Sequence, residues 1–547
     1  MLHKEQAAPV CDATTVAATT TAGKHINRKM NRNEMLQQLR TFHTEWDVLI
    51  IGGGATGLGA AIDAAVRGYK TILLEQHDFA KGTSSRSTKL VHGGVRYLQQ
   101  GNIKLVMDAL KERGYLKKNA PHLVKNQQFI VPNYKWWEGS FYGLGLKVYD
   151  WMSGTLGLGS SEWLSKEEVL EKSPTLDPKE LRGGVLYYDG QFDDARLAIN
   201  MAQTAAAYYA CVLNYCKVTG FLKDAHKKIC GVVATDTITQ TTYQIKAKAI
   251  INATGVFSDA VQEMDEPGKE KTISPSQGIH IVLDKEFLPG NAAIMIPHTD
   301  DGRVLFAVPW HNKIIVGTTD TPVTAINEEP KALAEEVNFI INHIGRYLTK
   351  DPVMIDVRSV FAGLRPLVKG SSKKTAELSR DHVITVSESG LVSVLGGKWT
   401  TYRKMAEDVV NIAAINSQLP QVECSTKEIA IHGAKPTSAY DNDYYYYGTD
   451  WQYIVRLMEE ADRMKEPIHA NLPYTHAQIV WAVQQEMAMT IEDVLSRRTR
   501  ALLLDARAAI EAAPLVATIL AGLLEWSDAV KEKQLQDFYK LASYYLP

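Results

Sequence analysis

The feature that most constrains the fold is a glycine pattern near the start of the chain. Residues 47–51, Asp-Val-Leu-Ile-Ile, form the short apolar run that is typical of a buried parallel strand. Gly52, Gly54 and Gly57 follow with the spacing G-x-G-x-x-G, and residues 59–65 continue as a helix of small residues. Gly52 allows the tight turn, Gly54 lets backbone N–H groups approach a pyrophosphate, and Gly57 lets helix and strand pack closely. We therefore predict a Rossmann-like dinucleotide-binding unit.

The residues after this helix narrow the choice of nucleotide. A second apolar strand is predicted at residues 70–74, and it ends in Glu75, 18 residues after Gly57. A carboxylate at this position accepts hydrogen bonds from ribose hydroxyls, which disfavours NADP but does not separate NAD from FAD. Residues 82–89, Gly-Thr-Ser-Ser-Arg-Ser-Thr-Lys, then form a loop rich in small hydroxyl side chains. Such a loop suits the second half of a larger polar cofactor.

Size and composition exclude several classes of protein. A length of 547 residues predicts about three domains. Hydrophobic residues make up 45% and charged residues 22%, as in soluble globular proteins, and the net charge of -2 gives no overall attraction to nucleic acid. The five cysteines show no metal-ligand spacing and no C-x-x-C pair, so we expect no disulfide framework, no metal site and a reducing compartment.

The N-terminal segment and the apolar stretches bear on location. Residues 1–45 are rich in Ala and Thr and lack the apolar core of a secretion signal, so we expect a mobile tail. Its basic residues, among them Arg32 and Arg40, are interpreted as a short surface helix in preference to an organelle address. The longest uncharged apolar stretch, between Glu511 and Glu525, contains Pro514 and is shorter than the roughly 20 residues that span a bilayer. We expect no transmembrane helix.

Further motifs make the chain resemble a known family. Residues 90–98 read Leu-Val-His-Gly-Gly-Val-Arg-Tyr-Leu, and together with the loop before them they resemble a segment distinctive of the FAD-dependent, quinone-linked glycerol-3-phosphate dehydrogenases. Similar motifs recur at residues 252–259, 278–282, 363–367, 379–382 and 396–403. The resemblance covers roughly residues 46–410, with Trp399 standing where a smaller apolar residue is usual.

The resemblance implies an α/β fold with three parts. A Rossmann-like FAD-binding domain is interleaved with a mixed-sheet substrate domain over residues 46–420, as in glutathione reductase and the amino-acid oxidases. A linker follows at residues 421–445, and an all-α C-terminal domain at residues 446–547. Within this last domain Arg497, Arg498 and Arg500 resemble the family's R-x-R-x-x-L element, which we interpret as structural or interfacial.

FAD is the cofactor that the resemblance implies, and no metal. The residues expected to contact FAD come from the two glycine-rich segments, the hydroxyl-rich loop and the strand that returns to the nucleotide. They are Gly52, Gly54, Gly57, Glu75, Thr83, Ser84, Ser85, Ser87, Lys89, His92, Gly93, Gly255, Gly397, Lys398 and Thr400.

The activity implied is oxidation of sn-glycerol 3-phosphate to glycerone phosphate by hydride transfer to FAD. Guanidinium groups grip a phosphate dianion well, and the resemblance brings Arg96, Arg365 and Arg380 to one site. His280 is the leading candidate for the base that accepts the hydroxyl proton, since an unperturbed histidine has a pKa near 6.5. His92 is the second candidate, although a contact to the cofactor loop is the favoured role.

Two more groups are expected beside the flavin and the substrate. Lys398 precedes an amphipathic stretch at residues 401–410, so its ammonium and a helix N-terminus would both favour reduced flavin. Thr400 or Thr401 is expected to cap that helix, and Thr401 is also a candidate substrate contact. Tyr97 either touches the substrate or packs beneath the flavin ring.

A basic and aromatic segment suggests where the electrons go. Between Lys104 and Lys147 eight basic residues stand against three acidic ones, and large apolar residues are interleaved with them. This mixture is typical of a protein surface that lies at the interface of an anionic membrane. A hydrophobic core beneath a solvated, charged face would have the same composition, so this alternative stays open. Members of the family are typically peripheral membrane enzymes that reduce quinone. The resemblance therefore implies a quinone as electron acceptor and a protein at the cytoplasmic face of the membrane or in the cytoplasm. Nucleic acid is not expected as a partner. A homodimer is left open.

Three rival functions stay open from the residues alone. An oxidase would pass the electrons to oxygen and release hydrogen peroxide. A FAD-dependent amine or amino-acid oxidase of the same fold would need no phosphate-binding arginines. A non-catalytic flavoprotein would need neither a base nor an anion clamp, so His280, Arg365 and Lys398 together argue against it.

Overall fold

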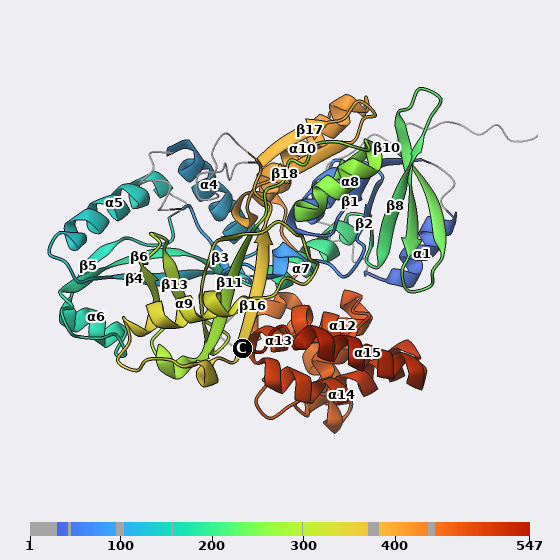
Figure 1. Ribbon diagram of the computed structural model, residues 1–547. Helices are drawn as coiled ribbons and strands as arrows, with labels where there is room; N and C mark the ends of the chain where they lie inside the picture. The colour runs from blue at the N-terminus through green and yellow to red at the C-terminus, as the bar shows by residue number, and fades with distance from the viewer. Residues whose placement is uncertain are drawn as a thin grey trace, which may run out of the picture.

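Two β-sheets and a cluster of C-terminal helices make up the protein (Figure 1). The computed structural model describes residues 30–41, 45–94, 103–154, 157–297, 299–369, 382–435 and 444–547. The chain crosses between the two sheets several times, because each sheet takes strands from distant parts of the sequence.

The first sheet has eight strands, and its core is parallel. The strand order is β17-β18-β10-β1-β2-β7, with β8 and β9 attached through β10. β1 pairs in parallel with both β2 and β10, which places the glycine loop at the carboxyl end of the central strands, where such sheets bind ligands. The strands are β1 (Trp46–Ile51), β2 (Thr71–Leu74), β7 (Cys211–Leu213), β8 (Cys216–Lys223), β9 (Ile229–Asp236), β10 (Thr242–Asn252), β17 (His382–Val386) and β18 (Val392–Gly396).

The second sheet has ten strands of mixed direction. Its order is β15-β11-β14-β13-β12-β4-β6-β3, with β16 paired to β11 and β5 paired to β6. The strands are β3 (Leu90–Val91), β4 (Val124–Asn133), β5 (Glu162–Ser165), β6 (Gly183–Phe192), β11 (Ser276–Asp284), β12 (Ala293–Ile296), β13 (Leu305–Trp310), β14 (Lys313–Gly317), β15 (Thr321–Pro322) and β16 (Ser359–Arg365). The interleaved α/β architecture predicted from the sequence is confirmed.

Helices cover both sheets. Three of them, α2, α7 and α10, pack on the first sheet and bury the small residues that the sequence places there. The helices are α1 (Arg32–Thr41), α2 (Ala55–Val66), α4 (Ile103–Asn119), α5 (Glu138–Ser153), α6 (Lys166–Lys172), α7 (Asp194–Ala207), α8 (Ser258–Asp265), α9 (Ala334–Gly345) and α10 (Tyr402–Asn416). Short 3₁₀ turns are η1 (Thr83–Ser85), η3 (Gly255–Phe257), η4 (Lys285–Phe287), η5 (Met354–Asp356), η7 (Trp399–Thr401) and η8 (Thr426–Glu428).

Helix α1 lies inside the segment that the sequence suggests is a mobile tail. Met35, Leu36 and Leu39 are buried, and α1 packs beside β7. Arg32 is buried as well, and its guanidinium pairs with Asp236 at 3.1 Å. Residues 32–41 are therefore an ordered surface helix, and the tail prediction does not apply to them; residues 1–29 lie outside the described residues.

The C-terminal part is helical, as predicted, and lies at the bottom of Figure 1 beside β16. It contains η10 (Tyr445–Asp450), α11 (Trp451–Glu460), η11 (Asp462–Lys465), α12 (His476–Glu486), the π-helix η12 (Asp493–Arg498), α13 (Ala501–Leu504), α14 (Ala506–Leu524) and α15 (Asp528–Ala542). Among the described residues α14 is the one helix long and apolar enough to cross a bilayer, by length and composition alone, a test that the core helices of other proteins also pass. One face of α14 is instead buried against α12, α13 and α15, which explains its apolar composition.

Candidate functional site

The first part of the site is the turn between β1 and α2. Gly52 adopts φ +110°, a conformation that side chains rarely tolerate. A Cβ atom on Gly57 would lie 1.9 Å from the carbonyl oxygen of Gly52, so the close packing of helix on strand requires glycine there. Gly54 precedes α2 and has no side chain to cap it, so the positive end of the helix faces the space beyond the turn.

Glu75 directly follows β2 and joins two loops through hydrogen bonds. Its carboxylate accepts one hydrogen bond from the N–H of Gly53 at 2.7 Å and another from the N–H of His77 at 2.8 Å. Burial raises the pKa of Glu75, and the two backbone N–H groups oppose that rise. The carboxylate is thus held at the edge of the glycine turn, where a ribose could reach it.

A cavity of about 470 Å³ opens at this turn. Its walls come from the carboxyl ends of β1, β2 and β10, from η1 and from the segment after β18. Eight of the residues expected to contact the cofactor line it: Gly52, Gly54, Glu75, Thr83, Ser84, Gly255, Gly397 and Lys398. Lys217 and Val218 also line it, from β8, and sequence reasoning did not predict them.

A second cavity, of about 230 Å³, adjoins the first and reaches the second sheet. Of the predicted site residues it is lined by Thr83, Ser87, His92, His280, Arg365, Gly397, Lys398 and Thr400. Both cavities share Thr83, Pro366, Gly397, Lys398 and Trp399, so together they form one elongated space. Sequence reasoning did not single out Arg86, Thr88, Gly278 or Thr318, which also line the second cavity.

His280 lies in the middle of β11, which is near one edge of the second sheet. The ring is 3% exposed, stacks on Phe361 at 4.8 Å between centroids, and its Nε2 lies 2.9 Å from the Thr88 hydroxyl. Burial lowers the pKa of His280 well below 6.5, and the cations of Lys89 and Arg365 lower it further. The imidazole is therefore neutral at pH 7 and can accept a proton.

Arg365 ends β16, the strand beside β11. Its guanidinium donates to the carbonyl oxygen of Thr319 at 2.8 Å and pairs with Asp320 at 3.0 Å. These contacts hold the planar group at the cavity wall while part of it stays accessible. Arg365 lies opposite Ser276 and His280 opposite Phe361, and both side chains line the second cavity, so an anion and a base can meet there.

Lys398 lies at the wall shared by the two cavities, just before η7 and α10. Neither threonine after it caps the helix, so this expectation is wrong. The Thr401 hydroxyl donates to the carbonyl oxygen of Lys398 at 3.3 Å, and the Thr400 hydroxyl lies 3.5 Å from the carbonyl oxygen of His92. The Trp399 indole N–H donates to the carbonyl oxygen of Ser84 at 2.9 Å, which ties this segment to the hydroxyl-rich loop.

Some predicted contact residues lie outside both cavities, where they shape the walls. Lys89 is fully buried, and its ammonium donates to Asp194 at 2.7 Å and to the carbonyl oxygen of Ser85 at 2.8 Å. This contradicts a direct role for Lys89 in binding the cofactor. Gly93 donates its N–H to the Tyr149 hydroxyl at 2.8 Å, and Thr401 points to the backbone of its own turn. Arg96, Tyr97 and Arg380 lie outside the described residues.

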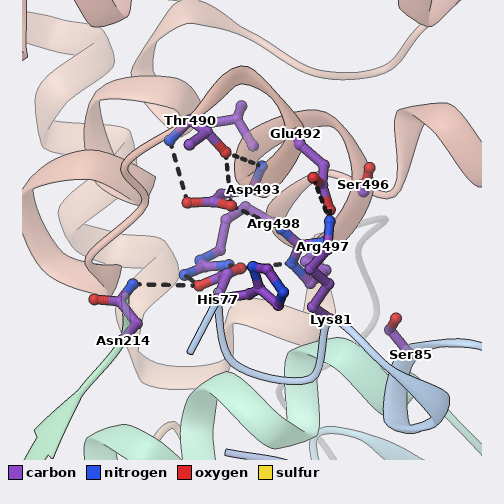
Figure 2. A network of polar contacts seen from close by, with 12 residues as sticks. His77, Lys81, Ser85, Asn214, Thr490, Glu492, Asp493, Ser496, Arg497 and Arg498 are labelled. Carbon is purple, nitrogen blue, oxygen red and sulfur yellow. Dashed lines mark hydrogen bonds and ion pairs between the residues drawn. The ribbon is translucent and has the colours of Figure 1, made fainter. Parts of the chain in front are cut away.

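The C-terminal domain reaches the hydroxyl-rich loop through buried arginines. Arg500 donates to the carbonyl oxygen of Ser85 at 2.9 Å and to Asp194 at 2.8 Å. Figure 2 shows Arg497 and Arg498 among the acidic residues of this interface, and both pair with the buried carboxylate of Asp78. The predicted structural and interfacial role of these arginines thus agrees with their positions.

The residues present fit FAD. The glycine turn and Glu75 would hold an adenosine diphosphate, and the elongated space continues past η1 to Lys398 and His280, where a second, larger half of a cofactor can lie. A redox ring at that end would adjoin a base and an anion-binding guanidinium, which is the set that oxidation of an anionic alcohol requires.

Comparisons with known proteins agree with this site. Residues 47–403 match the family model described as FAD dependent oxidoreductase, and residues 424–531 match the C-terminal domain of alpha-glycerophosphate oxidase. The mitochondrial glycerol-3-phosphate dehydrogenase of Homo sapiens is 39% identical over 97% of this chain and 77% of its own length. The corresponding Schizosaccharomyces pombe protein is 36% identical over 90% of this chain and 86% of its own.

A solved structure is similar over nearly the whole chain. Glycerol-3-phosphate dehydrogenase from Bacillus halodurans, complexed with FAD, superposes with a TM-score of 0.77 at 30% identity, covering 94% of this chain and 98% of that one. The two proteins therefore share one fold over nearly the whole chain, and the cofactor of this protein is FAD. The chain is a member of the FAD-dependent glycerol-3-phosphate dehydrogenase family.

Proposed function

We propose that the protein oxidises sn-glycerol 3-phosphate to glycerone phosphate and passes the electrons through FAD to a quinone. The single observation that supports this most is the second cavity, where His280, Arg365 and Lys398 converge beside the nucleotide cavity. A base, an anion clamp and a cation at the cofactor end are together what a phosphorylated alcohol needs and what an amine substrate does not. When bound, FAD supplies the acceptor for the hydride.

Each side chain has a distinct task in this proposal. The Arg365 guanidinium binds two phosphate oxygens and fixes the substrate with its second carbon facing the cofactor. Neutral His280 takes the hydroxyl proton, which it can do because burial keeps its pKa low. The ammonium of Lys398 favours the negative charge that builds at the cofactor end during the reaction. Arg96, Tyr97 and Arg380 stay predictions as further substrate contacts.

Two variants test this assignment. Arg365→Ala is expected to raise the KM for glycerol 3-phosphate chiefly, because the phosphate loses its fork of donors. His280→Ala is expected to lower kcat by about 10²- to 10⁴-fold, the usual contribution of a general base. Steady-state kinetics with an artificial quinone measure both values. Two variants with wild-type constants would remove these roles, and a wild-type enzyme with no turnover would remove the proposed function.

We propose a quinone as electron acceptor because one exposed surface of the protein suits contact with a membrane, where quinones are found. Helix α5 and the turn before it expose the large side chains Trp136, Trp137, Phe141, Leu144 and Trp151, and Trp136 and Trp151 are each 82% exposed. The neighbouring lysines Lys135 and Lys147 are exposed as well. Figure 1 places α5 at the outer end of the molecule beside β5, away from the C-terminal helices. Exposed tryptophans beside lysines suit the interface of an anionic membrane.

Only part of the basic and aromatic segment that the sequence suggests for membrane contact is exposed. Tyr142, Leu146, Tyr149 and Met152 are buried in the core, and Arg113 is buried against Asp189 at 2.8 Å. The contact we propose is therefore peripheral, made by one face of α5. In a flotation assay, the wild-type protein should float with vesicles that contain anionic lipid. The double variant Trp136→Ser, Trp151→Ser should stay at the bottom of the gradient. Ile355→Ser, at a residue 72% exposed elsewhere, is the matched control and should still float.

Oxygen is the second candidate acceptor. It is favoured by one observation, the match of residues 424–531 to a domain named for alpha-glycerophosphate oxidase. An oxidase releases one hydrogen peroxide per substrate, whereas a quinone-linked dehydrogenase releases little. Counting peroxide during turnover with and without a quinone decides between them. The relatives are named mitochondrial. For this chain we propose a peripheral location at a membrane surface. That the protein forms a homodimer stays a prediction.

A further inference from the structure

The imidazole of His280 has one nitrogen within reach of the substrate cavity. Its Nδ1 is buried and has no hydrogen-bond partner among the described residues. One face of the ring is covered by Phe361, and the backbone of Gly317 lies against its Cδ2 edge. The other nitrogen, Nε2, lies 2.9 Å from the hydroxyl oxygen of Thr88. Any proton that His280 accepts from the cavity must therefore arrive at Nε2.

Thr88 bears the hydroxyl that contacts that nitrogen, and both residues line the second cavity. The residue lines the second cavity together with Arg365 and Lys398, so it shares a wall with the groups assigned to phosphate and cofactor. A hydroxyl can accept one hydrogen bond and donate another at the same time. Thr88 can thus accept from a substrate hydroxyl while it donates to His280, which a valine of the same shape cannot do.

The loop around Thr88 is held in place on both sides. Asp194 accepts from the N–H of Ser87 at 3.0 Å and from its hydroxyl at 2.7 Å, and it pairs with Lys89 at 2.7 Å. Arg500 of the C-terminal domain binds the other oxygen of Asp194 at 2.8 Å. Lys89 adopts φ +62°, an uncommon conformation outside glycine, so these contacts fix a strained turn. The Thr88 hydroxyl is thereby prepositioned toward His280.

We propose that Thr88 is a catalytic residue that relays the substrate's hydroxyl proton to His280; this rests on the proposed function. The proton on the oxygen of the second carbon moves to Thr88 Oγ1, while the proton that Thr88 carried moves to His280 Nε2. The hydride on the same carbon leaves with its electron pair to FAD, and the carbon–oxygen single bond becomes the carbonyl of glycerone phosphate. Thr88 ends the step unchanged, and His280 ends it as imidazolium.

The test uses the FAD-loaded full chain and two variants of one residue. Thr88→Val keeps the shape and removes the hydroxyl, whereas Thr88→Ser keeps the hydroxyl and removes the methyl group. Anaerobic stopped-flow mixing with glycerol 3-phosphate measures the rate of flavin reduction. We expect Thr88→Val to be slower by about 10- to 100-fold, within the range of general base catalysis, and Thr88→Ser to stay within a few-fold of wild type. Calorimetric binding of inorganic phosphate should give the same Kd for all three proteins.

A proton inventory separates a relay from a residue that only orients His280. If two protons move in one step, the wild-type rate curves with the fraction of D₂O; if Thr88 only orients the ring, the dependence is linear. Wild-type rates in Thr88→Val, equal losses in both variants, or a linear inventory would each overturn the relay. A wild-type holoenzyme that glycerol 3-phosphate does not reduce would instead overturn the proposed function.

Discussion

Asp78 joins the loop after β2 to two buried arginines of the C-terminal domain. Its carboxylate is fully buried in the loop after β2, and it accepts from Arg497 Nε at 2.5 Å and from both terminal nitrogens of Arg498, at 2.7 and 2.9 Å. Burial alone would raise the pKa of Asp78, but Arg498 and Arg497 outweigh it and hold the pKa below 3.8. Asp78 is therefore ionised at neutral pH, and both of its ion pairs, with Arg497 and Arg498, are formed.

The substitution Asp78→Ala removes one carboxylate partner from each of two buried guanidinium groups, those of Arg497 and Arg498. Breaking a buried ion pair from one side costs about 3–5 kcal/mol. Arg497 keeps Asp493 and Glu492 as partners, and Arg498 keeps Glu486, so we expect the loss to stay in this range and not to double. At about 2.1 cal/mol/K of unfolding entropy per residue, a chain of 547 residues shifts by about 1 °C per kcal/mol, so the unfolding midpoint should fall by about 3–5 °C. Because Arg500 anchors Ser85, bound FAD should be released in the same transition.

The assay is thermal unfolding of the holoenzyme, followed by tryptophan fluorescence and by the fluorescence of released FAD. Asp300→Ala is the matched control, since Asp300 pairs with Arg346 through two hydrogen bonds of 2.6 and 2.8 Å but on the surface. Exposed pairs contribute little, so this variant should unfold with the wild-type protein. Equal midpoints for Asp78→Ala and Asp300→Ala would refute the reasoning from burial.

Two further changes give distinct readouts. Lys89→Met should shift the acid limb of flavin reduction to higher pH: the Lys89 ammonium, with a pKa of about 7, is charged where that limb lies and lowers the pKa of His280, so its loss lets His280 protonate earlier. Stopped-flow rates between pH 5 and 8 measure the limb, and an unmoved limb would contradict the coupling. Gly57→Ala should purify with little FAD, because its Cβ would lie 1.9 Å from the Gly52 carbonyl oxygen. Gly522→Ala, whose Cβ meets nothing within 4 Å, should keep a full complement by absorbance.

Sequence reasoning succeeded where the signal is local. The glycine turn could be predicted because its strand, spacing and helix lie within 20 or so residues, and each glycine answers a backbone requirement that the structure contains. Glu75 and the hydroxyl-rich loop at Thr83 are predicted from spacing and composition, and the family resemblance adds Lys398 as a residue beside the flavin. Helix α14 shows the opposite case: its apolar composition is set by neighbours that the sequence does not name.

The pairings that complete the site are not local. Thr88 and His280 are 192 positions apart, and Lys89 meets Asp194 across 105. A lysine in a cofactor loop suggests a cofactor contact, and only the position of α7 turns that lysine toward a buried carboxylate. Likewise the hydroxyls of Thr400 and Thr401 fit a helix cap by sequence, yet backbone carbonyls accept their hydrogen bonds. Such choices depend on the packing of the two sheets.

The central claim is that a phosphorylated secondary alcohol reduces the flavin of this protein. The most direct measurement is anaerobic: the FAD-loaded protein is mixed with glycerol 3-phosphate, and the visible absorbance of the flavin is followed before any acceptor is admitted. The account predicts prompt bleaching with glycerol 3-phosphate and much slower bleaching with glycerol, because only the phosphate engages Arg365. Flavin that stays oxidised with glycerol 3-phosphate, in folded protein with FAD bound, would contradict it.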